Sequence, residues 1–150
     1  MGQQLDVPSL ARQILNEQQI GVLASSTARG PHLSLVAFAA LFDDQVLYFA
    51  TSRSSRKFAN LEQDPRAAFL VDDRGRRVED LHRAVAVTVQ GSAREVDRTS
   101  RAPALSVYLE RHPHLIDFVQ APSCALMEMS MGAVEVVQAF QQVTRISFNP

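Results

Sequence analysis

The sequence HLSLVAFAALFDDQVLYFATSRSSRKFANLEQDP (residues 32–65) contains two apolar segments, a polar turn and a short helical segment in succession. Residues 32–41 alternate between two faces that are both largely apolar, which is typical of a strand covered on both sides. The turn FDDQ and the apolar residues 46–51 complete a predicted β-hairpin. A helix is expected next, and it should end before Pro65, because the residue preceding a proline disfavours helical geometry.

The remaining chain adds short strands and helices around this hairpin. Apolar residues at three- and four-residue spacing after Pro8 predict a first helix, and two further helices are expected near Pro103 and over 111–122. Apolar runs predict strands over 20–25, 67–72, 84–96, 124–131 and 133–140, with residues 143–148 extending the last of them. Gly91 indicates a bulge or bend. The pattern predicts a mainly β fold: a small barrel of six or seven antiparallel strands with flanking helices, in one domain spanning residues 1–150.

Composition narrows the class of protein. Apolar residues make up 46% and charged residues 21% of the chain, and the net charge of −1 provides no field that would attract nucleic acid. The sequence has one cysteine, Cys124, which suits a reducing compartment. No signal peptide and no apolar run long enough for a membrane span are recognisable. We therefore expect a cytoplasmic protein with neither nucleic acid nor membrane as a partner.

The start of the predicted helix carries an unusual charge pattern. A helix N-terminus has a partial positive charge, yet Arg56 and Lys57 fall in the first turn and Arg53 lies just before it. One interpretation is that these cations are simply solvated. The other is a bound phosphate, held by free backbone N–H groups, by the two cations and by neighbouring hydroxyl groups. The hydroxyl groups are those of Thr51, Ser52, Ser54 and Ser55. The stretch is not a P-loop, because it lacks the glycine-rich run.

The order of several short motifs resembles a known superfamily. The spacing T-x-x-x-SRK-x-x-x-L-x-x-x-P at 51–65, together with the sequences at 23–38 and 86–97, resembles the flavin-binding split-barrel superfamily of pyridoxamine 5′-phosphate oxidase. PHLSLV, NLEQDPRAAFLVDDR and YLERHP are similar to segments of its haem-utilisation and general-stress branch. The resemblance covers nearly the whole chain.

The resemblance implies a cofactor and a place for it. In such proteins the phosphate of flavin mononucleotide (FMN) is held by the Ser-Arg-Lys run, here Ser55, Arg56 and Lys57, together with the threonine that is here Thr51. We expect the neighbouring hydroxyl of Ser52 to belong to the same cofactor site. The isoalloxazine edge lies along the second strand, which here comprises Ser34, Leu35, Val36, Ala37 and Phe38. The resemblance further implies a homodimer with cofactor at the interface, and an FMN-dependent oxidoreductase acting with a small-molecule electron donor or acceptor. No catalytic side chain is assigned, because the flavin itself carries the redox chemistry.

Departures from the family leave alternatives open. Ser34 and Ala39 stand where the oxidase has an arginine and a lysine, and the chain contains no tryptophan, so oxidation of pyridoxamine phosphate itself is not expected. The alternatives to an oxidoreductase are a non-enzymatic flavin carrier or sensor, a haem-binding protein, and a protein that binds the deazaflavin cofactor F420.

Other candidate residues have plainer interpretations. His112 and His114 are predicted to be surface or helix-end residues, since no third ligand with metal-binding spacing accompanies them, and we expect no metal site. Cys124 is expected to be a buried, inert thiol. Met127, Met129 and Met131 alternate on one face, which favours core or dimer packing. The basic loop Arg74–Arg77 is expected to be a solvated hairpin tip, the alternative being a clamp on an anionic group.

Overall fold

The computed structural model of the chain describes residues 5–148. Its helices are α1 (Val7–Glu17), α2 (Arg56–Gln63), α3 (Asp80–Arg83), α4 (Arg101–Arg111) and α5 (Ile116–Gln120), with 3-10 turns at Arg98–Ser100 and Pro113–Leu115. Its strands are β1 (Ile20–Thr27), β2 (Gly30–Leu41), β3 (Val46–Ser52), β4 (Arg66–Asp72), β5 (Ala86–Glu95), β6 (Cys124–Gln138) and β7 (Gln142–Ser147). In this part of the chain, no helix has the length and apolar character needed to cross a membrane.

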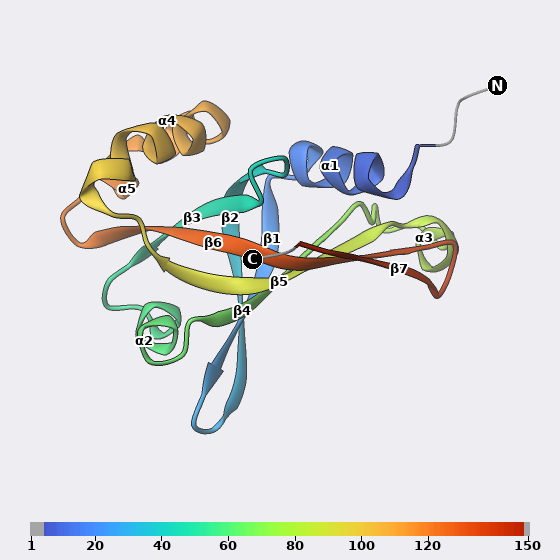
Figure 1. Ribbon diagram of the computed structural model, residues 1–150, viewed down its shortest axis with the longest axis horizontal. Helices are drawn as coiled ribbons and strands as arrows, with labels where there is room; N and C mark the ends of the chain where they lie inside the picture. Colours follow the sequence, from blue (N-terminus) through green and yellow to red (C-terminus); the bar gives the residue numbers. More distant parts are fainter. Residues whose placement is uncertain (1–4, 149–150) are drawn as a thin grey trace.

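Six strands close into an antiparallel barrel, with the helices around its ends (Figure 1). Neighbouring strands follow the order β3-β2-β1-β4-β5-β6, and β3 also pairs with β6, which closes the ring. The seventh strand, β7, pairs with β6 outside the barrel. The predicted mainly β fold of six or seven antiparallel strands with flanking helices is therefore confirmed.

The long strand β6 differs from the prediction. Residues 124–138 form one strand of 15 residues, so the expectation of two strands over 124–131 and 133–140 is wrong. One edge of β6 pairs with β5, while the other edge pairs first with β3 and then with β7. Residues 143–148 do not extend β6, because three successive residues with positive φ, at 139–141, reverse the chain into β7.

The predicted irregularity at Gly91 is confirmed. The β5–β6 register shifts between Gln90 and Gly91, where Gln90 pairs with Ala133 but Gly91 pairs with Met131. A Cβ atom at position 91 would overlap the carbonyl oxygen of Ser130, so the two backbones approach here as only glycine allows. This bulge bends the longest strand pair of the barrel.

Inward-facing side chains fill the barrel. Phe38 and Phe69 meet edge to face with ring centroids 5.1 Å apart, and α1 packs Ile14 and Leu15 against the same core. The methionines at 127, 129 and 131 are buried in this core, and Cys124 is buried in a second cluster beneath α4, as predicted. Regular alternation along β6 explains why sequence periodicity identified these residues correctly.

His112 lies at the end of α4, one of the two positions expected for it, but it is buried and does not lie at the surface. Only 2% of the residue is exposed, and its Nε2–H donates a hydrogen bond of 2.7 Å to the carbonyl oxygen of Phe38. The ring of Tyr108 packs against the imidazole with centroids 5.1 Å apart. Burial lowers the pKa of His112, so the neutral imidazole is the form that links α4 to the barrel.

Replacing Gly91 by alanine should destabilise the fold sharply. The added methyl group meets backbone atoms that cannot rotate away, and we expect the free energy of unfolding to fall by about 2 kcal/mol or more. Gly132→Ala is the matched control, because its Cβ would lie 3.4 Å from the carbonyl oxygen of Gln90, an ordinary contact. Urea unfolding of both variants tests this, and equal losses would contradict the assigned clash.

The burial of His112 predicts a pH dependence of stability. Because its folded pKa lies below the unfolded value, the unfolded chain binds more protons, and stability should fall as pH decreases from about 7 through 6.5 towards the folded pKa. Urea unfolding at pH values between about 7.5 and about 5.5 measures this loss of stability. This range lies above the one in which carboxylates titrate. His112→Gln should remove that component of the profile. An unchanged profile in the variant would show that another group is responsible.

Candidate functional site

A cavity opens where β2 and β3 separate. The two strands pair only over residues 38–41 and 46–49 of their described lengths, because β3 continues along β6 with Ala50–Ser52 opposite Cys124–Leu126. The preceding part of β2 pairs with β1 along one edge. Its other edge therefore presents backbone N–H and C=O groups that have no partner strand.

The cavity lies between this open strand edge, the turn from β3 to α2, and α4–α5. Its volume is about 330 Å³. It is lined by Leu35, Val36, Ala37, Ala50, Thr51, Ser52, Ser55, Lys57, Tyr108, Leu115 and Phe118. One side is thus polar and hydroxyl-rich and the other side is apolar and aromatic, which suits a ligand with a flat ring and a polar tail.

The hydroxyl groups are held in place by one another and by the helix. Ser55 is the N-cap of α2, and its Oγ accepts a hydrogen bond from the backbone N–H of Phe58. The same oxygen lies 2.7 Å from Oγ1 of Thr51, which is almost fully buried. Ser52 and Ser54 form a second pair, with their Oγ atoms 2.9 Å apart. The turn therefore presents preorganised hydroxyls beside a helix start.

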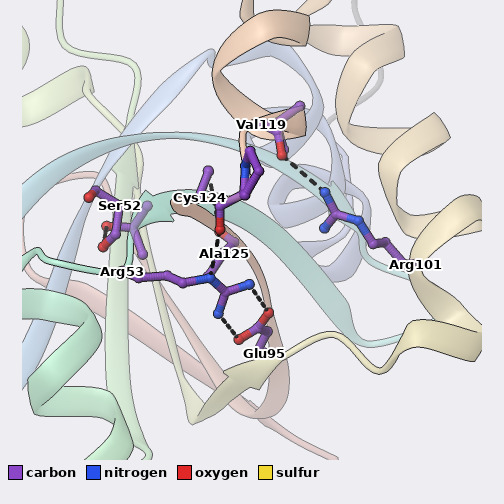
Figure 2. A network of polar contacts seen from close by, with 9 residues as sticks. Ser52, Arg53, Glu95, Arg101, Val119, Cys124 and Ala125 are labelled. Atoms are coloured by element: carbon purple, nitrogen blue, oxygen red, sulfur yellow. Dashed lines mark hydrogen bonds and ion pairs between the residues drawn. The ribbon is translucent and has the colours of Figure 1, made fainter.

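Arg53 anchors this turn to the barrel. Its two terminal nitrogens donate to the two carboxylate oxygens of Glu95 at 2.5 and 2.7 Å, in the bidentate geometry shown in Figure 2. Its Nε donates to the carbonyl of Pro122, and its backbone N–H to the carbonyl of Ser123. The hydrogen bonds from Arg53 lower the pKa of Glu95, so this carboxylate stays ionised. Arg53 is thus a structural residue whose charge is already paired.

Arg56 and Lys57 line different cavities. Lys57 lines the cavity between β2 and β3, whereas Arg56 lines a second one beside the β1–β2 hairpin. They diverge because successive helical residues are rotated by about 100°. Within residues 5–148 neither forms an ion pair. Lys57 is also the only lysine in the sequence, the other basic residues being arginines.

The wall formed by α4 and α5 was missed by sequence reasoning. Tyr108 is buried, its hydroxyl lies 3.5 Å from the carbonyl oxygen of Ala37, and burial raises its pKa to about 12, so the phenol is neutral. Phe118 reaches the same cavity while 44% of it stays exposed. Tyr108 lies on the apolar side of the helix that the sequence predicts near Pro103, but nothing in the sequence indicates which strand that side covers.

Of the predicted site residues, seven line the cavity and three do not. The seven that line it are Leu35, Val36, Ala37, Thr51, Ser52, Ser55 and Lys57. Phe38 faces the core, and its backbone groups are engaged, the N–H with Gln19 and the carbonyl with His112. Ser34 is outside the lining, and its Oγ is buried with no hydrogen-bond partner in the described chain.

Acidic neighbours partner the basic loop that precedes α3. Arg74 lies 3.1 Å from Asp72, and Arg77 lies 3.4 Å from Asp80. The Asp80 carboxylate also accepts hydrogen bonds from the backbone N–H groups of Gly75 and Arg77, which lowers its pKa. These pairings are compatible with the solvated hairpin tip expected from the sequence.

Comparisons with known proteins bear on the fold and on the family. A comparison with curated protein sequences finds no match. Among solved structures, a haem-binding protein from Mycobacterium smegmatis superposes with a TM-score of 0.86 at 20% identity, over 97% of this chain and 60% of that chain. General Stress Protein 26 from Bacillus anthracis has a TM-score of 0.68 at 22% identity, over 96% of this chain and 100% of that one. An FAD-binding protein from Mesorhizobium loti has a TM-score of 0.70 at 16% identity, over 88% of this chain and 94% of that one.

These likenesses concern the fold, and this chain spans 60% of the length of the M. smegmatis protein. The family assignment rests on the sequence itself. The profile of the pyridoxamine 5′-phosphate oxidase family matches residues 8–142, which include the open edge of β2, the β3–α2 turn and the α4–α5 wall. The chain therefore belongs to the pyridoxamine 5′-phosphate oxidase family.

Proposed function

We propose that this protein binds FMN in the cavity between β2 and β3 and acts as an oxidoreductase on a small molecule. The observation that carries the proposal is the meeting of an open strand edge with a hydroxyl- and lysine-bearing turn in one cavity. A flavin needs hydrogen-bond donors and acceptors along its ring edge, and FMN also needs a site for a phosphate dianion. Both requirements are met by residues that the sequence resemblance selects.

The phosphate end would lie at the β3–α2 turn. Thr51 and Ser55 supply ordered hydroxyls, and the first turn of α2 supplies free backbone N–H groups. Lys57 supplies a positive charge that has no ion-pair partner within residues 5–148. Arg56 stays a ligand predicted from the family, although its side chain lines the hairpin cavity. Bound phosphate would offset the repulsion between these cations and the helix dipole.

The ring end would lie along β2. Leu35, Val36 and Ala37 offer backbone groups for the flavin edge, while Leu115 and Phe118 offer an apolar surface beside the ring. Bound flavin supplies hydride and electron transfer, and the chain orients it and keeps water from it. The electron donor and acceptor would be small molecules that reach the ring through the open mouth of the cavity.

A homodimer would complete the site. The outward side chains Leu33 and Leu35 of β2 are 65% and 69% exposed, and Ile20 on the neighbouring strand is 57% exposed. A contiguous apolar sheet face of this kind is typical of a protein interface. Leu35 also lines the cavity, so a partner seated on this face would reach the cofactor.

Haem is the alternative suggested by the M. smegmatis neighbour. Among the cavity's lining residues, Tyr108 alone belongs to a side-chain type that commonly ligates haem iron. Its hydroxyl faces the carbonyl of Ala37, and its raised pKa disfavours the phenolate. The lining therefore favours flavin over haem.

The identity of the cofactor is tested by recording the visible spectrum of the freshly purified protein. The protein is then denatured, and the molecule that it releases is identified. Competition against FMN tests F420 binding. Reduction of the bound flavin by NADH or NADPH, followed by reoxidation with an added acceptor, distinguishes an oxidoreductase from a carrier or sensor.

Lys57→Ala should weaken FMN binding by at least about tenfold and riboflavin binding much less. Only FMN has the phosphate, and a charged hydrogen bond contributes about 1.5–3 kcal/mol. Fluorescence titration with both ligands measures the difference, and Arg98→Ala, an exposed cation on another element, is the control. Because Lys57 is the only lysine, its protection from acetylation by FMN gives an independent readout. Equal losses for the two ligands would contradict the phosphate assignment.

Leu33→Glu should convert a dimer into a monomer, because it places a charge at the centre of the exposed apolar face. Light scattering after size-exclusion chromatography measures the mass. Val78→Glu is the control, since Val78 is 94% exposed on the loop before α3. A monomeric unsubstituted protein at micromolar concentration, or a dimeric Leu33→Glu variant, would contradict this interface.

A further inference from the structure

We propose that residues 97–123, which include α4 and α5, form a hinged lid that opens and closes over the cavity between β2 and β3. The lid contributes Tyr108, Leu115 and Phe118 to the cavity lining, whereas the other lining residues belong to β2, β3 and the β3–α2 segment. In Figure 1 the two helices lie together at one end of the barrel, apart from the other helices. A ligand in this cavity is therefore covered by the lid, whichever cofactor it is.

The two ends of the lid lie side by side. The chain leaves β5 after Glu95, and the backbone N–H of Val96 still donates to a carbonyl of β6, the strand that the chain re-enters at Cys124. Arg53 holds both ends, because its guanidinium group binds the Glu95 carboxylate (Figure 2) and also donates to the carbonyl of Pro122. Adjacent ends that are fixed to one pair of strands form a hinge.

The two helices of the lid are tied to each other. Arg101, at the start of α4, donates to the carbonyl of Val119 in α5 at 3.0 Å (Figure 2). In the 3-10 turn between the helices, the backbone N–H of Leu115 donates to the carbonyl of His112. We therefore expect the two helices to move as one body about the hinge.

Hydrogen bonds from two adjacent residues hold the far end of α4, roughly 16 Å along the helix from its start. Arg111 donates to the carbonyl of Leu15 at 3.2 Å and to that of Gln18 at 2.6 Å. These carbonyls lie at the C-terminus of α1, where the helix dipole favours a cation. His112 donates to the carbonyl of Phe38 in β2. The closed position of the lid thus depends on contacts to α1 and to β2 that lie far from the hinge.

The surface beneath the lid consists largely of small side chains. The buried cluster under α4 is separate from the barrel core, and the barrel contributes Ala39, Ala50 and Cys124 to it. The free-energy cost of separating two surfaces scales with the apolar area that becomes exposed, and alanine contributes little. Elements with little buried apolar area are the ones that open locally. We therefore expect the lid to open while the barrel stays folded.

The reactivity of Cys124 measures this opening. Cys124 is the only cysteine in the sequence, it is 3% exposed beneath α4, and burial raises the pKa of its thiol. Iodoacetamide labelling followed by mass spectrometry should modify Cys124 faster than the global unfolding equilibrium allows. The labelling rate should also rise with urea less steeply than global unfolding does, because opening the lid exposes only part of the buried surface.

Arg111→Gln should increase the labelling rate at least about tenfold, because it removes charged hydrogen bonds to α1 and leaves the hinge intact. Its urea dependence should stay shallow. The matched controls are Arg98→Gln, an exposed arginine near the hinge, and His114→Gln, an exposed histidine beside His112. Both controls should label like the unsubstituted protein. Urea unfolding of each variant checks that the barrel is folded.

The outcomes are distinct. Labelling with the urea dependence of global unfolding, or an unchanged rate in Arg111→Gln, overturns the lid. A further titration rests on the proposed function: at about 100 times its Kd, FMN should slow labelling of the unsubstituted protein roughly a hundredfold, because it stabilises the closed form. FMN that binds without slowing the labelling also overturns the lid. A protein that does not bind FMN but opens as described would refute the proposed function and leave the lid intact.

Discussion

The pairing of β3 is the constraint on which the rest of the structure depends. The strand must reach β6 to close the barrel, and β6 can accept it because β7 occupies only the later part of the same edge. Over its first four residues β3 pairs on both edges, with β2 and with β6, and over its last three it pairs with β6. Closure of the barrel thus leaves half of β2 with an unpaired edge, and the candidate site occupies that gap.

The charges around this gap have different roles although they are close in sequence. Arg53 is neutralised by a bidentate ion pair with Glu95, which ties the β3–α2 turn to β5. Lys57 and Arg56 line two different cavities, and in the described part of the chain neither forms an ion pair. A cation at a helix N-terminus costs a few tenths of a kcal/mol, whereas a charged hydrogen bond to a ligand contributes about 1.5–3 kcal/mol. The free energy gained from one charged hydrogen bond to an anion therefore exceeds the cost of a cation at the helix start.

The outer face of β1 and β2 links the cavity to assembly. Leu35 is exposed on this face and also lines the cavity, while Ala39 on the same side of β2 is covered by α4. The helices therefore cover one half of the strand and leave the other half uncovered. If a second copy covers it, cofactor binding and dimerisation stabilise each other, because each orders a surface that the other uses.

The sequence by itself determined the features that depend on local patterns. Alternation located the strands and the buried methionines, and Gly91 marked the bulge. The family resemblance, carried by several motifs, named seven of the eleven residues that line the cavity. Such features are readable because strand periodicity, backbone sterics and helix capping act within a few residues. The continuity of β6 was misread, since the apolar pattern does not reveal that two different strands share one edge in turn.

Tertiary structure alone decided the rest. His112 is buried because α4 packs onto β2 and the carbonyl of Phe38 accepts a hydrogen bond from its Nε2–H, which no local pattern indicates. Tyr108 and Phe118 line the cavity for the same reason, and the divergence of Arg56 from Lys57 depends on how α2 is rotated against the barrel. In each case the contact joins residues far apart in the chain, and its geometry is set by the packing of whole elements rather than by the residues beside it.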